Sequence, residues 1–204
     1  MLEEIKDLLR RESEAILSIP VTAAFGEATD LILQRVHRQE GKLVCSGMGK
    51  AGQIAINIAT TFSSTGTPAI FLHPSDAQHG DLGVLQGHDL LLLVSNSGKT
   101  REIIELVGLA KGLNPGIPLI VITGNPEGEL ARQADVLLHT GHPEEVCPLG
   151  LTPTTSTTTM TVIGDILVVL MMKKIEFKPA DYARRHHGGY LGIKSRNKDE
   201  DSSR

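Results

Sequence analysis

The sequence predicts an α/β fold built on a doubly wound parallel sheet, and three observations support this prediction. Short apolar runs alternate along the chain with segments of helical periodicity. The composition is 40% hydrophobic but only 3% aromatic, so aliphatic side chains must fill the core, as is typical of parallel sheets. The length of 204 residues suits one domain. We therefore expect a single domain over residues 1–195 and a disordered charged tail over 196–204.

The elements are expected in the following chain order. Apolar residues at helical spacing predict one helix over 5–16, closed by Pro20, and a second from Phe25 to about Arg38. Five apolar runs predict the strands, at 43–46, 69–72, 90–94, 118–123 and 136–138. Helical patterns follow the first, third and fourth of these runs, and the polar segment 73–87 is predicted as a loop. The Thr-rich segment 152–161 contains a helix start signal, so a long helix and then a short one over about 179–185 complete the chain.

The third apolar run, Leu90–Val94, leads into the most informative turn of the sequence, Ser95–Thr100. A helical pattern starts directly after this turn, and the free N–H groups and dipole of a helix start favour an anion. The hydroxyls of Ser95, Ser97 and Thr100 add further donors. The turn has neither the spacing of a nucleotide-triphosphate loop nor Gly-x-Gly-x-x-Gly, so a small phosphorylated metabolite is the expected ligand. The alternative is an ordinary helix cap, which Ser and Thr also favour.

Other polar residues follow neighbouring strands and are expected at the same edge of the sheet, where ligands of such sheets bind. Lys50, in a glycine-rich turn after the first strand, could stabilise an oxyanion, although it could equally be a solvated surface lysine. The segment 73–83 holds two histidines and two aspartates, but no pair has the spacing of a metal site on one helix face, so no metal is expected. One of Glu144 and Glu145 could face the site as a proton shuttle.

Composition excludes several classes of function. The net charge of −4 and the absence of a basic tract before the tail argue against nucleic acid as a partner. No apolar run free of charge and glycine approaches the roughly 18 residues of a membrane span, so no membrane association is expected. The acidic N-terminus is unlike a secretory signal. Cys45 and Cys147 lie in apolar stretches without metal-ligand spacing and are interpreted as reduced thiols of a cytoplasmic protein.

Several motifs together resemble the sugar isomerase (SIS) domain of the arabinose-5-phosphate isomerases, over about residues 41–192. The string Cys147-Pro-Leu-Gly-Leu-Thr-Pro-Thr-Thr-Ser156 is the most specific of them. The others are Gly47-Met-Gly-Lys50-Ala-Gly, Ser64-Thr-Gly-Thr-Pro68, His73-Pro, His79-Gly-Asp-Leu-Gly83, Ser95-Asn-Ser-Gly98 and His186-His-Gly-Gly-Tyr-Leu-Gly192. The resemblance implies a flavodoxin-like five-stranded sheet and a homotetramer with sites at subunit interfaces.

The resemblance also implies a reaction, the interconversion of D-ribulose 5-phosphate and D-arabinose 5-phosphate, which feeds Kdo synthesis for lipopolysaccharide or capsule. No cofactor is implied. The residues that match catalytic positions are Lys50, Glu102, Glu145 and His186. Those that match substrate and phosphate positions are Ser46, Gly66, Thr67, His73, His79, Ser95, Ser97, Thr100, Thr154 and Ser156. Glu145 is the expected base, with Glu102 as its competitor, His186 as proton relay and Lys50 as oxyanion stabiliser.

The sequence departs from the family pattern in two motifs. Lys99-Thr100-Arg101 replaces the usual Glu-Ser-Ser, and His187 replaces the proline of a His-Pro-Gly-Gly motif. Many members also carry CBS modules after the SIS domain, and none is expected within this chain. Two alternatives stay open: a non-catalytic SIS regulator that binds a phosphosugar or CMP-Kdo, and an isomerase of a hexulose or heptulose phosphate. CMP-Kdo is also the expected feedback ligand if the chain is an isomerase.

Overall fold

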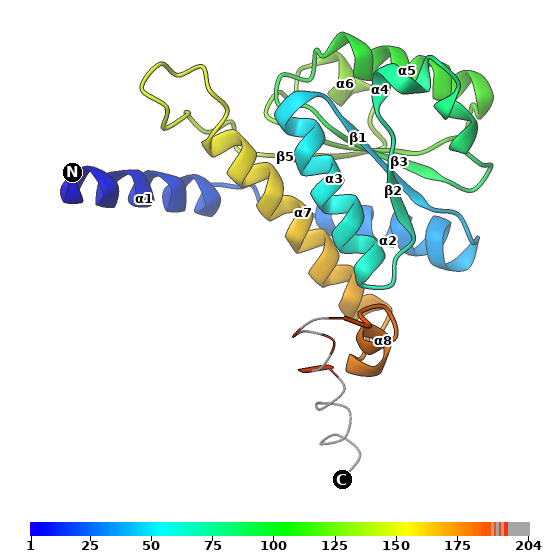
Figure 1. The fold of residues 1–204 in the computed structure, drawn as a ribbon. Helices are drawn as coiled ribbons and strands as arrows, with labels where there is room; N and C mark the ends of the chain where they lie inside the picture. The colour runs from blue at the N-terminus through cyan, green and yellow to red at the C-terminus, as the bar shows by residue number, and fades with distance from the viewer. Residues whose placement is uncertain (189, 191, 193, 196–204) are drawn as a thin grey trace.

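A computed structural model describes residues 1–188, 190, 192, 194 and 195, and its centre is one sheet of five parallel strands (Figure 1). The strand order is β2-β1-β3-β4-β5, the flavodoxin-like order. The strands are β1 (Leu43–Gly47), β2 (Ala69–Phe71), β3 (Leu90–Val94), β4 (Leu119–Thr123) and β5 (Val136–His139). The predicted fold class is therefore confirmed, and the predicted strand at 90–94 has the predicted bounds. The predicted tail, 196–204, lies outside the described residues.

The three central strands, β1, β3 and β4, are buried along their whole length, so helices must cover both faces of the sheet. Successive side chains alternate between the faces. Cys45, Leu92 and Ile120 belong to one core cluster, whereas Val44 and Leu91 belong to the other.

The first face is covered by α2 (Ala24–Ile32), its π-helical continuation η1 (Leu33–Arg38), α3 (Gly49–Ser64) and α7 (Thr155–Lys174). The second is covered by the short α4 (Pro74–Ala77) and η2 (Asp81–Val84), by α5 (Arg101–Leu113) and by α6 (Glu129–Arg132). The prediction of segment 73–87 as a loop is therefore wrong in part, because α4 and η2 lie within it and pack against the core with Ala77, Leu82 and Val84.

Helix α7 packs closely against α3 at one glycine. A Cβ on Gly164 would lie 2.5 Å from Cγ1 of Ile58, so a larger residue fits there only if the Ile58 side chain or α3 moves. By length and composition α7 could cross a membrane, but half of its apolar window is buried inside the protein. The sequence did not predict a span of that length because Gly164 and Asp165 interrupt the run; within the fold, both residues belong to a core helix.

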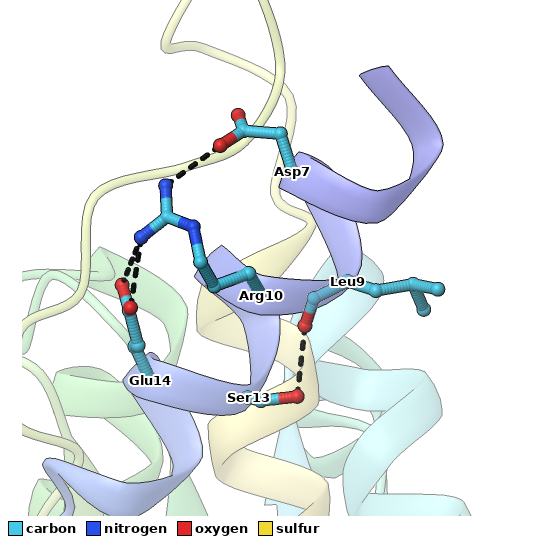
Figure 2. Close-up of polar contacts among 5 residues, drawn as sticks. All are labelled: Asp7, Leu9, Arg10, Ser13 and Glu14. Atoms are coloured by element: carbon cyan, nitrogen blue, oxygen red, sulfur yellow. Dashed lines mark hydrogen bonds and ion pairs between the residues drawn. The ribbon is translucent and has the colours of Figure 1, made fainter. Parts of the chain in front are cut away.

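Helices α1 (Leu2–Leu17) and α8 (Pro179–Ala183) lie outside the layers of the sheet (Figure 1). Helix α1 extends away from the sheet and contacts α7, and Ala15 is its one buried residue. Its outer face carries Arg10, which forms ion pairs with Asp7 at 2.6 Å and with Glu14 at 2.8 Å (Figure 2). Helix α8 follows α7 at the other end of the molecule (Figure 1).

Candidate active site

The turn between β3 and α5 forms the first part of the site. The backbone N–H of Ser95 donates to Ile122 O at 3.0 Å and fixes the turn to β4. The hydroxyls of Ser95 and Thr100 are 2.9 Å apart and hydrogen-bonded, and the exposed Ser97 lies between them. Gly98 has φ +62°, which favours glycine, and a Cβ there would lie 3.2 Å from Thr123 Oγ1. The turn is therefore held rigidly at both ends while Ser97 faces solvent.

Among the residues that the structure describes, none caps the start of α5 with its side chain. Thr100 occupies the cap position without a side-chain hydrogen bond to the helix, so the first N–H groups of α5 remain available to an anion. Lys99 and Arg101 flank this start and are exposed, and Arg101 pairs with Glu105 at 2.6 Å. Glu102 lies in the first turn of the helix and is partly buried. The start of α5 thus combines free donors, two cations and one carboxylate.

A cavity of about 590 Å³ lies beside this turn and extends along the carboxyl ends of β4 and β5. His139 Nε2 and His142 Nδ1 donate to the carbonyl oxygen of Gly124, at 3.3 and 3.0 Å. Asn125 Nδ2 donates to Ser97 O at 2.9 Å and connects the two loops. The residues that line the cavity are Asn96, Ser97, Lys99, Gly124, Asn125, Pro126, His139 and His142. The two histidines were not among the residues predicted from the sequence, where their only signal is their place after the fifth strand.

Glu145 forms the second part of the site, at the start of α7. Its Oε2 accepts hydrogen bonds from Thr154 N at 2.7 Å, Thr154 Oγ1 at 3.0 Å and Ser156 N at 3.3 Å. The hydroxyl of Ser156 donates to Oε1. The carboxylate therefore occupies the N-terminus of α7, a position that the helix dipole favours. This differs from the expectation for Thr154 and Ser156, because Glu145 takes the donors that we had expected to face the phosphate.

Burial and hydrogen bonding act on Glu145 in opposite directions. Burial raises its pKa, but the hydrogen bonds from Ser156 and Thr154 together lower the pKa by more, so the pKa is below the usual 4.5. The side chain is therefore ionised at neutral pH, which is the state that a general base requires.

The loops after β1 and β2 supply four further predicted residues. Lys50 is exposed in the first turn of α3. Ser46 is fully buried and donates to Leu72 O at 2.6 Å, so its hydroxyl links β1 to the end of β2. His73 begins α4, with its Nδ1 3.7 Å from Asp76 Oδ2, and His79 is exposed after α4. These loops follow carboxyl ends of strands, as the turn Ser95–Thr100 does.

Three predicted residues lie away from the carboxyl edge of the sheet, at the opposite end of the folded molecule. Gly66 and Thr67 precede β2, where a Cβ on Gly66 would lie 2.8 Å from Cε2 of Phe177. Thr67 is buried, and its Oγ1 lies 3.0 Å from His37 Nε2. His186 follows α8, and its ring stacks on Tyr182 with the ring centroids 3.7 Å apart. These residues lie at the amino edge of the sheet and the far end of α7.

The length of α7 separates His186 from Glu145. The helix has 20 residues, which corresponds to about 30 Å. The loop with Glu145 precedes the helix and α8 follows it (Figure 1). Within one chain, the structure therefore brings together the turn of α5 and the loops after β1 and β2, but it does not bring His186 to Glu145.

The two cysteines are free thiols and differ in environment. Burial raises the pKa of Cys45. Cys147 lies in the loop after Glu145, where hydrogen bonds, chiefly from the side chain of Thr152, lower its pKa to about 7. The predicted apolar surroundings are thus correct for Cys45 and wrong for Cys147. Among the described residues, no group of three or more His, Cys, Asp or Glu side chains could hold a metal ion.

The sheet order and the uncapped start of α5 define a doubly wound α/β domain with its candidate ligand site at the carboxyl edge of the sheet. The chain belongs to the SIS domain family, whose profile matches residues 37–170. It is 45% identical over 186 residues to arabinose 5-phosphate isomerase KdsD from Yersinia pestis. That match covers 91% of this chain and 55% of the relative, so the chain spans about half the length of that protein.

Two solved structures are similar over nearly their whole length. A protein from Bacteroides fragilis NCTC 9343, described as a candidate phosphosugar isomerase involved in capsule formation, is 67% identical, with a TM-score of 0.92. The match covers 93% of this chain and 99% of that one. The Escherichia coli CFT073 protein c3406, in complex with arabinose 5-phosphate, is 34% identical with a TM-score of 0.81, and the match covers 91% of this chain and 96% of that one.

Proposed function

We propose that this protein is an aldose–ketose isomerase that interconverts D-ribulose 5-phosphate and D-arabinose 5-phosphate. The observation that carries the proposal is that the chain holds both an uncapped, cation-flanked helix start at α5 and an ordered, ionised carboxylate at Glu145, each in a segment that follows the carboxyl end of a strand. The relatives named as arabinose 5-phosphate isomerases and the arabinose 5-phosphate complex of c3406 support this choice of substrate.

In the proposed reaction the phosphate binds at the start of α5, with Ser97 and the free N–H groups as donors. Glu145 removes the proton from C2 of the open-chain aldose, and the electron pair moves onto the C1 carbonyl oxygen to give an enediolate. Lys50 stabilises this oxyanion. A proton then returns to C1 from Glu145, while the proton of the C2 hydroxyl passes to the C1 oxyanion, so that O1 becomes a hydroxyl, C2 becomes the carbonyl carbon and the product is the ketose. Glu102, in the first turn of α5, is the competing candidate for the base.

The assembly that completes the site is also part of the proposal. Because α7 separates His186 from Glu145 by about 30 Å, His186 reaches the reacting carbons only from a second copy of the chain. Gly66 and Thr67 lie at the same end as His186. Thr67 is buried, however, and Gly66 lies under Phe177, so we assign only His186 to a neighbouring subunit's site. We propose a homotetramer with its sites at the subunit interfaces, in which His186 acts as proton relay.

The cellular role that fits this reaction is the supply of D-arabinose 5-phosphate for Kdo, for lipopolysaccharide or capsule. The similarity to the Bacteroides fragilis protein, which is described as involved in capsule formation, favours the second of these uses. A cytoplasmic location and feedback by CMP-Kdo belong to the same proposal.

A coupled assay with D-ribulose 5-phosphate and its six- and seven-carbon analogues tests the reaction. We expect D-arabinose 5-phosphate to form from the pentulose at least tenfold faster than an aldose forms from either analogue. Turnover of an analogue alone would identify a different isomerase. Tight binding of the pentulose without turnover would identify a non-catalytic regulator.

A mixture of two inactive variants tests the shared site. Glu145→Gln supplies an intact His186, and His186→Ala supplies an intact Glu145. If the two groups come from different subunits, mixing the variants and allowing subunit exchange restores part of the activity. If one chain supplies both groups, the mixture stays as inactive as its components.

A further inference from the structure

The peptide group between Glu145 and Val146 is held at both of its polar atoms. Arg11 Nη2 on α1 donates to the carbonyl oxygen of Glu145 at 3.3 Å. The N–H of Val146 donates to Thr155 Oγ1 at 3.0 Å. One end of this peptide group is thus fixed by α1, and the other by the first residue of α7.

Glu12 fixes the second of these contacts. The hydroxyl of Thr155 donates to Glu12 Oε1 at 2.8 Å, so its single hydrogen points to α1 and a lone pair remains for the N–H of Val146. Thr155 is buried, with 1% of its surface exposed. Glu12 Oε2 is also buried and has no hydrogen-bond partner among the described residues. Burial of this oxygen is unfavourable, so the hydrogen bond from Thr155 to Oε1 is the contact that holds the Glu12 side chain in place.

We propose that Arg11 and Glu12 are positioning residues: they hold the Glu145–Val146 peptide and thereby set the direction of the Glu145 carboxylate. The inference rests on the proposed function, in which Glu145 is the base. Thr154 and Ser156 hold the carboxylate itself, and α1 holds the backbone from which the side chain starts. Loss of the backbone contact leaves the carboxylate hydrogen-bonded but displaced from the reacting carbon.

The variant Glu12→Ala tests this role. We expect kcat to fall by about 10- to 100-fold, the range that an ångström of misplacement costs, while KM changes by less than about twofold because no hydrogen bond joins α1 to the turn of α5. The acidic limb of the pH profile of kcat, which reports the ionisation of Glu145, should stay in place, because the hydrogen bonds from Thr154 and Ser156 that lower its pKa remain. Glu12→Gln keeps an acceptor oxygen for Thr155 and should restore most of kcat.

Glu14→Ala is the matched control on the same helix. Glu14 pairs with Arg10 on the outer face of α1, and the side chains of both are more than half exposed (Figure 2). Its loss removes one carboxylate from α1 without touching the loop of Glu145, so kcat, KM and the pH profile should stay as in the wild type.

Hydrogen exchange of the Val146 amide separates this inference from the proposed function. Faster exchange in Glu12→Ala than in Glu14→Ala supports the contact even if the wild type proves not to isomerise pentose phosphates, in which case the proposed function fails alone. Equal exchange in the two variants, or faster exchange with an unchanged kcat in an active enzyme, overturns the inference. If Glu12→Ala does not fold, Arg11→Ala, which removes a partly exposed side chain, gives the same readouts.

Discussion

Residues with hydroxyl side chains stand before α5 and in the first turn of α7, yet the two helix starts differ in what occupies them. The start of α5 has no side-chain cap, and the exposed Ser97 stands beside it. The start of α7 is filled by Glu145, which accepts hydrogen bonds from Thr154 and Ser156. Since both starts favour an anion, the contrast supports the proposal that α5 binds the phosphate of the substrate, whereas α7 already holds a carboxylate of the chain itself.

Glu145→Gln is the strongest test of this contrast. Gln keeps the size of the side chain but cannot accept the substrate proton, so we expect kcat to fall by about 10² to 10⁴, the usual contribution of a general base. Exchange of solvent protons into D-ribulose 5-phosphate should disappear, while binding of the substrate remains. The neighbouring exposed carboxylate provides the control, since Glu144→Gln should exchange protons at the wild-type rate. Full exchange in Glu145→Gln would transfer the role of base to Glu102.

Ser97→Ala tests the open start of α5. A hydrogen bond to a charged phosphate contributes about 1.5–3 kcal/mol, so KM should rise about tenfold or more while kcat changes little. Steady-state kinetics with the pentulose measure both constants. Ser13→Ala on α1, whose hydroxyl bonds to Leu9 O (Figure 2), should leave KM unchanged. An unchanged KM in Ser97→Ala would place the phosphate elsewhere.

Ser156→Ala should have the reverse signature. Ser156 donates to Glu145 rather than to an open site, so its loss should lower kcat by about three- to tenfold, the cost of one ordinary hydrogen bond, with KM unchanged. The pKa of Glu145 should rise toward its usual value, and the acidic limb of the kcat profile should move to higher pH. Thr161→Ala, further along α7, is the control. A rise in KM instead of a fall in kcat would mean that both helix starts bind the substrate.

The smallest expected effect is on the pH dependence of the free energy of unfolding. The folded-state pKa of Glu145 is lowered, so its contribution to stability is present above the unfolded value of about 4.5 and is lost as the pH falls through the folded value. Urea unfolding from pH 7 to pH 3 should show wild type and Glu145→Gln converging in free energy of unfolding at the acid end. A constant difference across this range would mean that the carboxylate charge does not contribute.

Most of the fold could be predicted from the sequence because its signals are local. The run Leu90–Val94 and the helical pattern after it fixed β3 and the start of α5. The short helices α4 and η2 could not be predicted in this way, because four residues are too few to show helical periodicity. The π-helical end of α2 was predicted as ordinary helix because its apolar spacing looks the same at this length.

The candidate site could be predicted only in part, because its decisive contacts join distant parts of the chain. The turn Ser95–Thr100 lies within six consecutive residues and was found. Glu12 meets Thr155 across 143 positions, and no pattern within α1 indicates this contact. His139 and His142 were overlooked because a histidine after a strand has no distinctive spacing.

Gly164 has a consequence for how two copies of the chain would work together. Gly164 lies near the middle of α7 and has no Cβ, which allows α7 to lie close to α3. A rigid helix transmits any displacement at its centre to both ends, so a larger residue there would move the loop of Glu145 and the segment of His186 in the same event. In the proposed tetramer, each site would then have its Glu145 displaced in one subunit and its His186 displaced in the other. A substitution far from the substrate would thus change the relative position of two groups from different chains.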